Sequence, residues 1–393
     1  MRRLSEIARK NERLVVGLTS GTSADGVDAA LVAIKGSGLG TEAEVLLDDT
    51  FPYPDHVREA VLSASDGKLS VKEICSLNYR LGESFADACL SLLASSRVDP
   101  EDVDVIGSHG QTVCHIPCTS RDEKVVTAST LQLAESSIIA QRTGSVVVCD
   151  FRSADIAAGG EGAPLAPCVD YILFRDLRAS RGFLNVGGIA NLSALPAGCR
   201  SDEVIGFDTG PGNMVLDYLA DRLFKAEYDN GGTRAATGEP SEEIVERLLQ
   251  LEFFKVSPPK STGRELFGST FSERLITIAE EDALSKEDMM ATAVMLTTCS
   301  IHRAYVEFVA KSTEIEELYV SGGGVENRTL MHQLEEVFSP IPVYTIDRLG
   351  VPAQAKEALL FAVLANQAIA GEPSSLPQVT GATRKTILGK IIQ

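Results

Sequence analysis

The sequence predicts an α/β protein whose helices pack on mostly parallel or mixed sheets. Apolar strand-like runs alternate with segments of helical periodicity, and several of the runs end in glycine-rich turns. At 393 residues the chain exceeds one ordinary core, so two domains are expected. Two similar glycine-centred hairpins suggest related halves. A single doubly wound sheet with glycine turns at its carboxyl edge remains an open alternative.

Five strand-like segments each carry a glycine turn. Residues 13–34 form two apolar runs around small and hydroxyl residues, which predicts a hairpin with a wide turn. Residues 103–113 predict a strand and turn, and residues 181–195 repeat the pattern of the first hairpin. In 204–219 a strand breaks at Gly-Pro-Gly before a helix, and in 317–334 a strand ends in three glycines at a helix start.

Helical periodicity lies between these strands. Leu77, Leu81, Phe85 and Leu92 share one face of a helix expected over 72–96. A later helix is predicted by Val294, Ile301, Tyr305 and Phe308. Residues 356–370 are almost wholly apolar after the first turn and predict a buried helix.

Composition and charge exclude several classes of function. A net charge of −19 argues against nucleic acid or an anionic membrane as the main partner, since both need a basic surface. No apolar run approaches the roughly 18 residues of a membrane span, and the N-terminus lacks a secretory signal. Most of the eight cysteines have apolar neighbours, which indicates a reducing, cytoplasmic location. Cys114, His115 and Cys118 suggest zinc, but no second cluster completes four ligands.

The turn of the first hairpin has the composition of a phosphate-binding loop. SGTSADGVD supplies Gly21 and Gly26, whose backbone can approach phosphate closely, with the hydroxyls of Ser20, Thr22 and Ser23. Asp25 and Asp28 are carboxylates that could hold Mg²⁺ directly or through water. The chain has no G-x-x-x-x-G-K-[ST] motif, so this is not a Walker loop. A plain solvent-exposed hairpin is the structural alternative.

Asp208 is the candidate general base. It lies in GFDTGPGN at the end of a strand, beside a turn that Pro211 keeps from being helical. The equally open alternative is a structural aspartate that caps the following helix.

Other polar residues predict contacts to a substrate. His109 and Gln111 are expected at a strand end, where Gln111 could bind a sugar hydroxyl or amide. Asp150, Arg152, Asp155 and Glu161 surround the Gly159–Gly160 pair, either as an ion-pair network or as a polar-substrate cradle. Lys260 and Arg264 are the expected mobile cations for a transferred phosphoryl group, or else solvated loop charges.

Eight ordered motifs resemble one family, the anhydro-N-acetylmuramic acid kinases. The motifs are GLTSGTSADGVD, GSHGQTV, DFRSADIAAGGEGAPL, NVGGIANL, GFDTGPGN, PPKSTGRE, SGGGVENRTL and AKEALLFA. The resemblance spans nearly the whole chain, from about Leu14 to the PQVTGATRKTILG tail. It implies the two-domain actin-like ATPase fold with a central ATP cleft. The halves would be 1–178, with the tail 372–393 packing back on it, and 179–371.

The resemblance also implies ATP with Mg²⁺ and assigns residues to the two ligands. Those implied for ATP are Gly21, Thr22, Ser23, Asp25, Gly26, Asp28, Gly187, Gly188, Asn191, Gly210, Gly212, Asn213, Gly322, Gly323, Gly324 and Asn327. Those implied for the sugar are His109, Gln111, Thr112, Asp150, Arg152, Asp155, Gly162 and Glu357. Asp25 or Asp28 would meet Mg²⁺, and a homodimer is expected.

The implied reaction belongs to cell-wall sugar recycling. Asp208 would deprotonate a water that attacks C1 of a 1,6-anhydro sugar, and the released O6 would take the γ-phosphate of ATP. Glu161 stands where glutamine is expected, and Ser153 and Ala154 stand where some members have arginines. These departures keep a levoglucosan kinase as the alternative. A chaperone-like ATPase of the same fold is disfavoured because the chain is too short for a peptide-binding domain.

Overall fold

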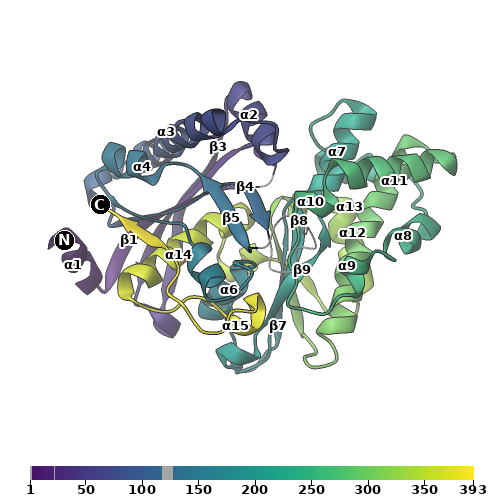
Figure 1. Ribbon diagram of the computed structural model, residues 1–393. Helices are drawn as coiled ribbons and strands as arrows, with labels where there is room; N and C mark the ends of the chain where they lie inside the picture. Colours follow the sequence, from purple (N-terminus) through teal and green to yellow (C-terminus); the bar gives the residue numbers. More distant parts are fainter. Residues whose placement is uncertain (1, 22, 117–126) are drawn as a thin grey trace. The chain divides into compact units, whose positions relative to one another are not determined.

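The chain forms two compact units in the computed structural model, which describes residues 2–21, 23–116 and 127–393 (Figure 1). Unit 1 comprises Met1–Phe174 and Gly350–Gln393, and unit 2 comprises Arg175–Leu349. Unit 2 is therefore one continuous segment, whereas unit 1 is built from both ends of the chain.

Unit 1 is organised around a seven-stranded mixed sheet. Its order is β12-β6-β4-β1-β2-β3, with β5 paired to β4. The β1–β2 and β2–β3 pairs are antiparallel, and the β1–β4 and β4–β6 pairs are parallel. The strands are β1 (Glu12–Ser20), β2 (Gly26–Lys35), β3 (Glu42–Pro52), β4 (Val105–Ile116), β5 (Ser129–Leu133), β6 (Val146–Cys149) and β12 (Lys390–Ile392).

Helices cover this sheet. The α-helices are α1 (Arg2–Arg9), α2 (Asp55–Ser65), α3 (Val71–Ser96), α4 (Ser136–Thr143), α5 (Ser153–Ala157), α6 (Ala166–Phe174), α14 (Lys356–Ala370) and α15 (Pro377–Thr380). Short 3₁₀ turns are η1 (Gly38–Gly40), η2 (Pro100–Asp102) and η8 (Ala353–Ala355). Helix α3 begins at a capping box, in which Ser70 and Glu73 satisfy each other's backbone amides.

The two faces of β1 meet different helices because side chains alternate along a strand. Val16 and Leu18 belong to the core cluster that also contains α3 residues such as Phe85. Gly17 faces α14, and a β-carbon there would lie 1.8 Å from the carbonyl oxygen of Ala358. Gly107 is its register partner on β4, and its β-carbon would lie 2.2 Å from the Phe361 carbonyl oxygen. This glycine pair lets α14 approach the sheet backbone.

Unit 2 contains a five-stranded sheet with the order β11-β10-β7-β8-β9. The β7–β8 and β8–β9 pairs are antiparallel, and β7–β10 and β10–β11 are parallel. The strands are β7 (Arg181–Val186), β8 (Ile189–Leu195), β9 (Ile205–Pro211), β10 (Glu317–Ser321) and β11 (Val343–Thr345).

The helices of unit 2 form its core together with this sheet. They are α7 (Asn213–Phe224), α8 (Glu242–Leu248), α9 (Glu252–Lys255), α10 (Arg264–Phe267), α11 (Ser269–Glu281), α12 (Lys286–Phe308) and α13 (Arg328–Phe338). The 3₁₀ turns are η3 (Ser201–Glu203), η4 (Asn230–Gly232), η5 (Ala235–Thr237), η6 (Gly323–Glu326) and η7 (Ile346–Leu349). Helix α12 contributes the longest buried face, from Met289 to Tyr305.

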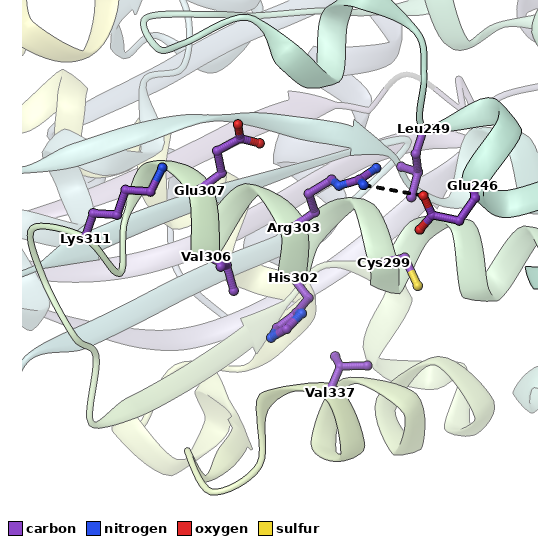
Figure 2. Close-up of a pocket in the computed structure, with 9 residues that line it drawn as sticks. All are labelled: Glu246, Leu249, Cys299, His302, Arg303, Val306, Glu307, Lys311 and Val337. Carbon is purple, nitrogen blue, oxygen red and sulfur yellow. Dashed lines mark hydrogen bonds and ion pairs between the residues drawn. The ribbon is translucent and has the colours of Figure 1, made fainter.

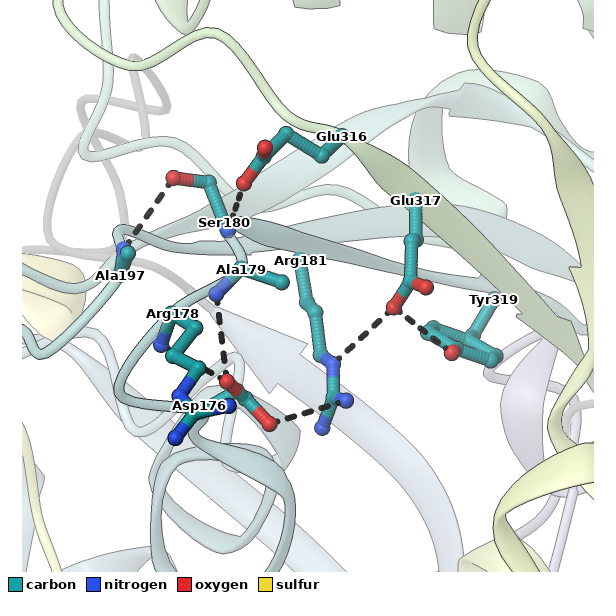
Figure 3. A network of polar contacts seen from close by, with 9 residues as sticks. All are labelled: Asp176, Arg178, Ala179, Ser180, Arg181, Ala197, Glu316, Glu317 and Tyr319. Carbon is teal, nitrogen blue, oxygen red and sulfur yellow. Dashed lines mark hydrogen bonds and ion pairs between the residues drawn. The ribbon is translucent and has the colours of Figure 1, made fainter.

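A polar network ties β7 to β10 near the start of unit 2 (Figure 3). Asp176 accepts hydrogen bonds from the amides of Arg178 and Ala179. The Arg181 guanidinium lies 3.1 Å from Asp176 and 3.2 Å from Glu317, which pairs the first residue of β7 with the first of β10. The network fixes the register at which the two parallel strands begin.

The two sheets share one strand order. When β5 and β12 are left aside, unit 1 has the order β6-β4-β1-β2-β3, in which β6 and β4 are the fifth and fourth strands in chain order and β1, β2 and β3 the first three. The order β11-β10-β7-β8-β9 of unit 2 follows the same scheme. In both, the first three strands are antiparallel neighbours and the fourth pairs parallel to the first. The predicted fold of two related α/β halves is confirmed. The single doubly wound sheet is wrong.

The hairpins and helices foreseen from sequence are present, with two differences. Strand β4 does not end at the glycine of SHGQT: it continues to Ile116, because Gly110 takes a positive φ of 76° where β4 passes from β1 to β5. The boundary between units falls after Phe174 rather than 178, and residues 350–371 pack in unit 1 rather than unit 2. Across the described residues, no helix is long and apolar enough to cross a membrane.

Candidate active site

Gln111 of β4 holds the turn of the first hairpin. Its side-chain oxygen accepts a 2.6 Å hydrogen bond from Ser20 Oγ, and its amide nitrogen donates to the Gly21 carbonyl at 3.0 Å. Both ends of this buried amide are therefore engaged within the protein. The structure brings Gln111 to the predicted phosphate loop, and a sugar contact from it stays a prediction. Thr22 lies outside the described residues.

Asp28 is the central carboxylate of this region. Burial, together with the nearby carboxylates of Glu357 and Asp25, raises its pKa to about 6. A 2.7 Å hydrogen bond from Thr50 Oγ1 opposes the shift. Asp25 pairs with Arg58 at 3.0 Å. The residues from the first hairpin and from α14 thus form one acidic group, which a bound cation would stabilise.

This acidic group is too small to hold a metal by protein ligands alone. No set of three or more His, Cys, Asp or Glu side chains suited to a metal occurs in the part of the chain that the structure describes. Mg²⁺ accompanying a nucleotide needs only one or two carboxylates besides the phosphates. Asp28 with Glu357 meets that requirement. The zinc interpretation depended on Cys118, which lies outside the described residues.

A second group in unit 1 gathers several predicted sugar contacts. Arg152 Nε donates to His109 Nε2 at 2.9 Å, and Arg152 Nη1 donates to the Gly162 carbonyl at 2.8 Å. Asp155, fully buried, accepts from the Gly162 amide at 2.9 Å and from Thr380 Oγ1 at 2.8 Å. The loop before α6 and the C-terminal tail are thereby joined to β4.

His109 is neutral in this arrangement. Burial, and then the charge of Arg152, hold its pKa well below the usual value of 6.5. Because Nε2 accepts from Arg152, Nδ1 carries the proton and donates to the Gly110 carbonyl at 3.0 Å. The ring stacks on Phe361 of α14 with a centroid distance of 4.4 Å. His109 therefore orients the Arg152 guanidinium.

The remaining predicted sugar contacts have structural partners. Asp150 pairs with Lys390 of β12 and accepts from Ser153 Oγ. Thr112 Oγ1 accepts from Gln132 Nε2 at 3.2 Å. Glu161, where glutamine was expected, is buried, and its amide donates to the Thr380 carbonyl at 2.7 Å. The cluster from Asp150 to Gly162 is thus at least in part an ion-pair and hydrogen-bond network.

In unit 2, the β7–β8 turn is bound to the start of α7. The carbonyl of Gly187 accepts from the Asn213 amide at 2.8 Å, and that of Gly188 accepts from Gly212 at 3.0 Å and Met214 at 3.2 Å. The first amides of α7 are therefore used within the protein. A nucleotide role for Gly212 and Asn213 stays a prediction, and it does not rest on those two amides.

Asp208 is buried in the edge strand β9. Its Oδ2 accepts a 2.8 Å hydrogen bond from the Thr262 amide, and its own amide donates to the Lys260 carbonyl at 3.2 Å. Asn191 of β8 is its register partner. The capping alternative does not describe this residue, because α7 has Gly212 at its N-cap with no side-chain cap.

The β10–α13 connection contains the three predicted glycines. Gly322 has a positive φ of 81°, and a β-carbon there would lie 2.7 Å from Asn185 Oδ1. Asn327 is buried and caps α13, because its Oδ1 accepts from the Leu330 amide at 3.0 Å. Gly323 and Gly324 lie in η6 and Gly210 in β9. Asn327 has a structural task that the sequence did not reveal.

Lys260 is not the mobile loop cation that the sequence suggested. Only 7% of it is exposed, and its Nζ donates to the Phe253 carbonyl at 3.1 Å. Burial lowers its pKa to about 8, against the attraction of Glu307 and Asp208. The aromatic residues around it come from distant parts of the chain.

Two open pockets are lined by residues outside the motifs. Figure 2 shows one of about 510 Å³ against α12. Its lining is Glu246, Leu249, Cys299, His302, Arg303, Val306, Glu307, Lys311 and Val337. A second, of about 600 Å³, is lined by residues between Glu6 and Gly144. Neither lining includes a residue predicted from the motifs, so the candidate site rests on the motif residues.

A family profile described as Anhydro-N-acetylmuramic acid kinase matches residues 13–393. The chain belongs to this family. An anhydro-N-acetylmuramic acid kinase of Salinibacter ruber is 47% identical over 99% of this chain and 98% of its own length. One of Caldanaerobacter subterraneus subsp. tengcongensis is 44% identical over the whole of both chains.

The solved structures are less similar in sequence to this chain than the members of the family are. A 2-hydroxyisocaproyl-CoA dehydratase activator from Clostridium difficile with bound ADPNP is 12% identical over 91% of this chain and 96% of its own, with a TM-score of 0.45. A ROK family glucokinase from Streptomyces griseus is 14% identical over 90% of this chain and 99% of its own, with a TM-score of 0.38. The fold assignment rests on the repeated strand order.

Several residues around the family motifs were not foreseen. Thr50 and Arg58 bind the aspartates of the first hairpin, and Thr262 binds Asp208. Lys356 lies 3.1 Å from Asp170 at the start of α14, beside Glu357. A hydroxyl or backbone amide carries no motif of its own. Only the apolar flanks of Lys356 marked it as a buried charge that needs a partner.

Proposed function

We propose that this chain is an ATP-dependent kinase that opens the 1,6-anhydro ring of anhydro-N-acetylmuramic acid and phosphorylates O6. The products are N-acetylmuramic acid 6-phosphate and ADP. The observation that carries the proposal is Asp208, a buried carboxylate held by the Thr262 amide inside a motif of this family.

The chemistry balances with one water and one ATP. Asp208 takes a proton from water as the water oxygen bonds to C1, and the C1–O6 bond breaks. The electron pair left on O6 attacks the γ-phosphorus, and ADP leaves. The proton on Asp208 then returns to solvent. Transfer of the phosphoryl group relieves the negative charge that develops on O6.

The first hairpin serves the nucleotide in this proposal. Gly21, Ser23 and Gly26 bind phosphate oxygens. Asp28 would hold Mg²⁺, and its repulsion by Glu357, a residue that the resemblance assigns to the sugar, supports a cation at this place. Mg²⁺, when bound, neutralises charge on the transferred phosphoryl group.

Arg152 is the candidate partner for the substrate's carboxylate, since a guanidinium can bind a carboxylate through two parallel hydrogen bonds. Levoglucosan has no carboxylate. The names of the curated relatives likewise favour anhydro-N-acetylmuramic acid over levoglucosan. We also infer a homodimer from the family resemblance, and size-exclusion chromatography with light scattering tests it.

Substrate identity is tested by incubating the enzyme with ATP, Mg²⁺ and each anhydro sugar separately. Mass spectrometry should find a sugar phosphate heavier than anhydro-N-acetylmuramic acid by one phosphoryl group and one water. A product from levoglucosan alone would overturn the substrate. ATP hydrolysis with no phosphorylated sugar would overturn the kinase assignment.

Asp208→Asn tests the mechanism. Asparagine keeps the shape and can still accept from Thr262, but it cannot take the proton, so turnover should fall about a hundred- to ten-thousand-fold. ATP affinity should change less than about threefold, because binding does not need the base. In ¹⁸O-water the label should appear at C1, read before the anomeric oxygen exchanges. Near-normal turnover of Asp208→Asn, or label in the phosphate ester, contradicts the assignment.

A further inference from the structure

Lys260 occupies an aromatic cage beneath the candidate base. Its Nζ lies 4.6 Å from the ring centroid of Phe308, 4.7 Å from that of Phe253 and 5.7 Å from that of Phe207. The same nitrogen donates to the Phe253 carbonyl at 3.1 Å. Three rings and a carbonyl oxygen compensate a cation for much of the water that it loses on burial.

The backbone around Lys260 is attached to Asp208 at two points. The carbonyl of Lys260 accepts from the Asp208 amide at 3.2 Å, and the amide of Thr262 donates to Asp208 Oδ2 at 2.8 Å. These bonds lie within three residues of chain, which run along the outer edge of β9, the last strand of its sheet. Phe207 precedes Asp208 in β9, so its ring projects from the opposite face of the strand.

The charge of Lys260 also bears on Asp208. The carboxylates of Glu307 on α12 and Asp208 on β9 attract the ammonium group and raise its pKa, while burial lowers it to about 8. Figure 2 shows Glu307 on α12. Lys260 is therefore predominantly a cation at neutral pH, and it favours the ionised form of Asp208 that a base requires.

We propose that Lys260 is a positioning residue for the reaction. Its caged ammonium group anchors residues 258–262 along β9, so that the Thr262 amide holds the Asp208 carboxylate in one orientation. The inference rests on the proposed function, in which Asp208 is the base. It assigns no contact between Lys260 and ATP or sugar.

The test is a double-mutant cycle of Lys260→Met with Asp208→Asn. Methionine keeps the length and apolar stem but has neither the charge nor the donor. In the Asp208 background, Lys260→Met should lower kcat about 10- to 100-fold, because small displacements of a catalytic group are costly. The KM for ATP should change less than about threefold. In the Asp208→Asn background, Lys260→Met should lower kcat less than about threefold. In that background there is no base whose position Lys260 could affect.

The pH profile distinguishes positioning from folding. Lys260→Met should move the acid limb of log kcat/KM to higher pH, because the cation that favours a charged Asp208 is gone. The wild type should lose activity above about pH 8 as Lys260 loses its proton, and Lys260→Met should not show this loss. Lys255→Met is the matched control, since Lys255 is the last residue of α9, precedes the 258–262 segment and is exposed. It should leave the profile and kcat unchanged.

The outcomes distinguish a failure of the proposed function from a failure of the positioning role of Lys260. Near-normal turnover of Asp208→Asn overturns the proposed function. A slow Asp208→Asn enzyme with equal costs of Lys260→Met in both backgrounds overturns the positioning role, as does a folded Lys260→Met enzyme with unchanged kcat. If Lys260→Met does not fold, Phe308→Leu takes its place in the double-mutant cycle with Asp208→Asn. This variant removes one ring of the cage. It should lower kcat several-fold only when Asp208 is present, and additive costs would overturn the inference.

Discussion

The folded structure destabilises the ionised form of the Asp28 carboxylate. Burial and the neighbouring charges of Glu357 and Asp25 raise its pKa to about 6, so at neutral pH it is ionised at a cost. A raised carboxyl pKa destabilises the folded state above the unfolded pKa of about 4. The associated penalty grows as pH rises from about 4 to 6 and is then constant.

Asp28→Asn should therefore stabilise the ligand-free protein at pH 7.5. The gain should be about 1–2 kcal/mol after allowance for solvent screening, and it should vanish near pH 4, where Asp28 is protonated in the folded state. Asparagine can still accept from Thr50. Urea unfolding followed by circular dichroism measures the difference, since the chain has no tryptophan. A gain that is equal at both pH values contradicts the burial argument. Kinase turnover should fall in the same variant.

The residues of the candidate site were predictable where chemistry is concentrated in motifs. Asp208, Asp28 and the glycine turns stood out because few structural needs place so many small and acidic residues together. Lys260 was misjudged because its cage comes from Phe207, Phe253 and Phe308, which neither spacing nor periodicity connects. A lysine in a Pro-Pro-Lys-Ser segment resembles a loop charge until those rings are placed.

Helix α14 lies against the backbone of β1 and β4 rather than against their side chains. Gly17 and Gly107 are register partners and both face it, which explains why a glycine stands in the middle of each buried strand. The helix carries Glu357 in its first turn and Phe361, which stacks on His109. The glycine pair thus sets the position of the predicted site residues that α14 carries or contacts.

Gly17→Ala should displace α14. A β-carbon 1.8 Å from the Ala358 carbonyl oxygen cannot be accommodated by a side-chain movement, so we expect a loss of about 3 kcal/mol or more in the free energy of unfolding. Gly40→Ala is the control, because nothing lies within 4 Å of a β-carbon there. Thermal unfolding of both variants measures the effect. Equal melting temperatures would contradict the close approach.

The sequence predicted most elements but not how far they extend or where they pack. Periodicity placed the helix over 72–96 within one residue of α3, since that helix has one continuous apolar face. It could not show that β4 continues past Gly110, because a glycine at positive φ looks the same in a turn and in a strand that changes partners. Residues 356–370 were assigned to the wrong half because the glycines that receive them lie hundreds of residues earlier.

At the scale of the whole molecule, the same strand order is built twice, but the two units are not equally self-contained. Unit 2 has every strand and helix of its core within Arg175–Leu349. Unit 1 needs α14 from the far end of the chain to cover the glycine face of its sheet. The two units should therefore differ when each is expressed by itself.

A fragment of residues 175–349 should unfold cooperatively, whereas a fragment of residues 1–174 should not. Without α14, the fragment of residues 1–174 leaves one face of β1 and β4 exposed to water, and it also lacks β12. Thermal unfolding by circular dichroism and dye binding to exposed apolar surface compare them. Adding residues 350–393 through a flexible linker should restore cooperative unfolding to the fragment of residues 1–174. A cooperative transition in 1–174 alone would contradict this account.

Because unit 1 is built from both ends of the chain, its parts are synthesised at different times in the cell. Ribosomes add about 5–20 residues per second, so α14 appears roughly ten to forty seconds after β6 has been synthesised. Throughout that interval the nascent first half displays an uncovered apolar surface, while the inserted half can finish folding on its own. The newborn N-terminal segment is therefore the part of this chain that chaperones and proteases meet first.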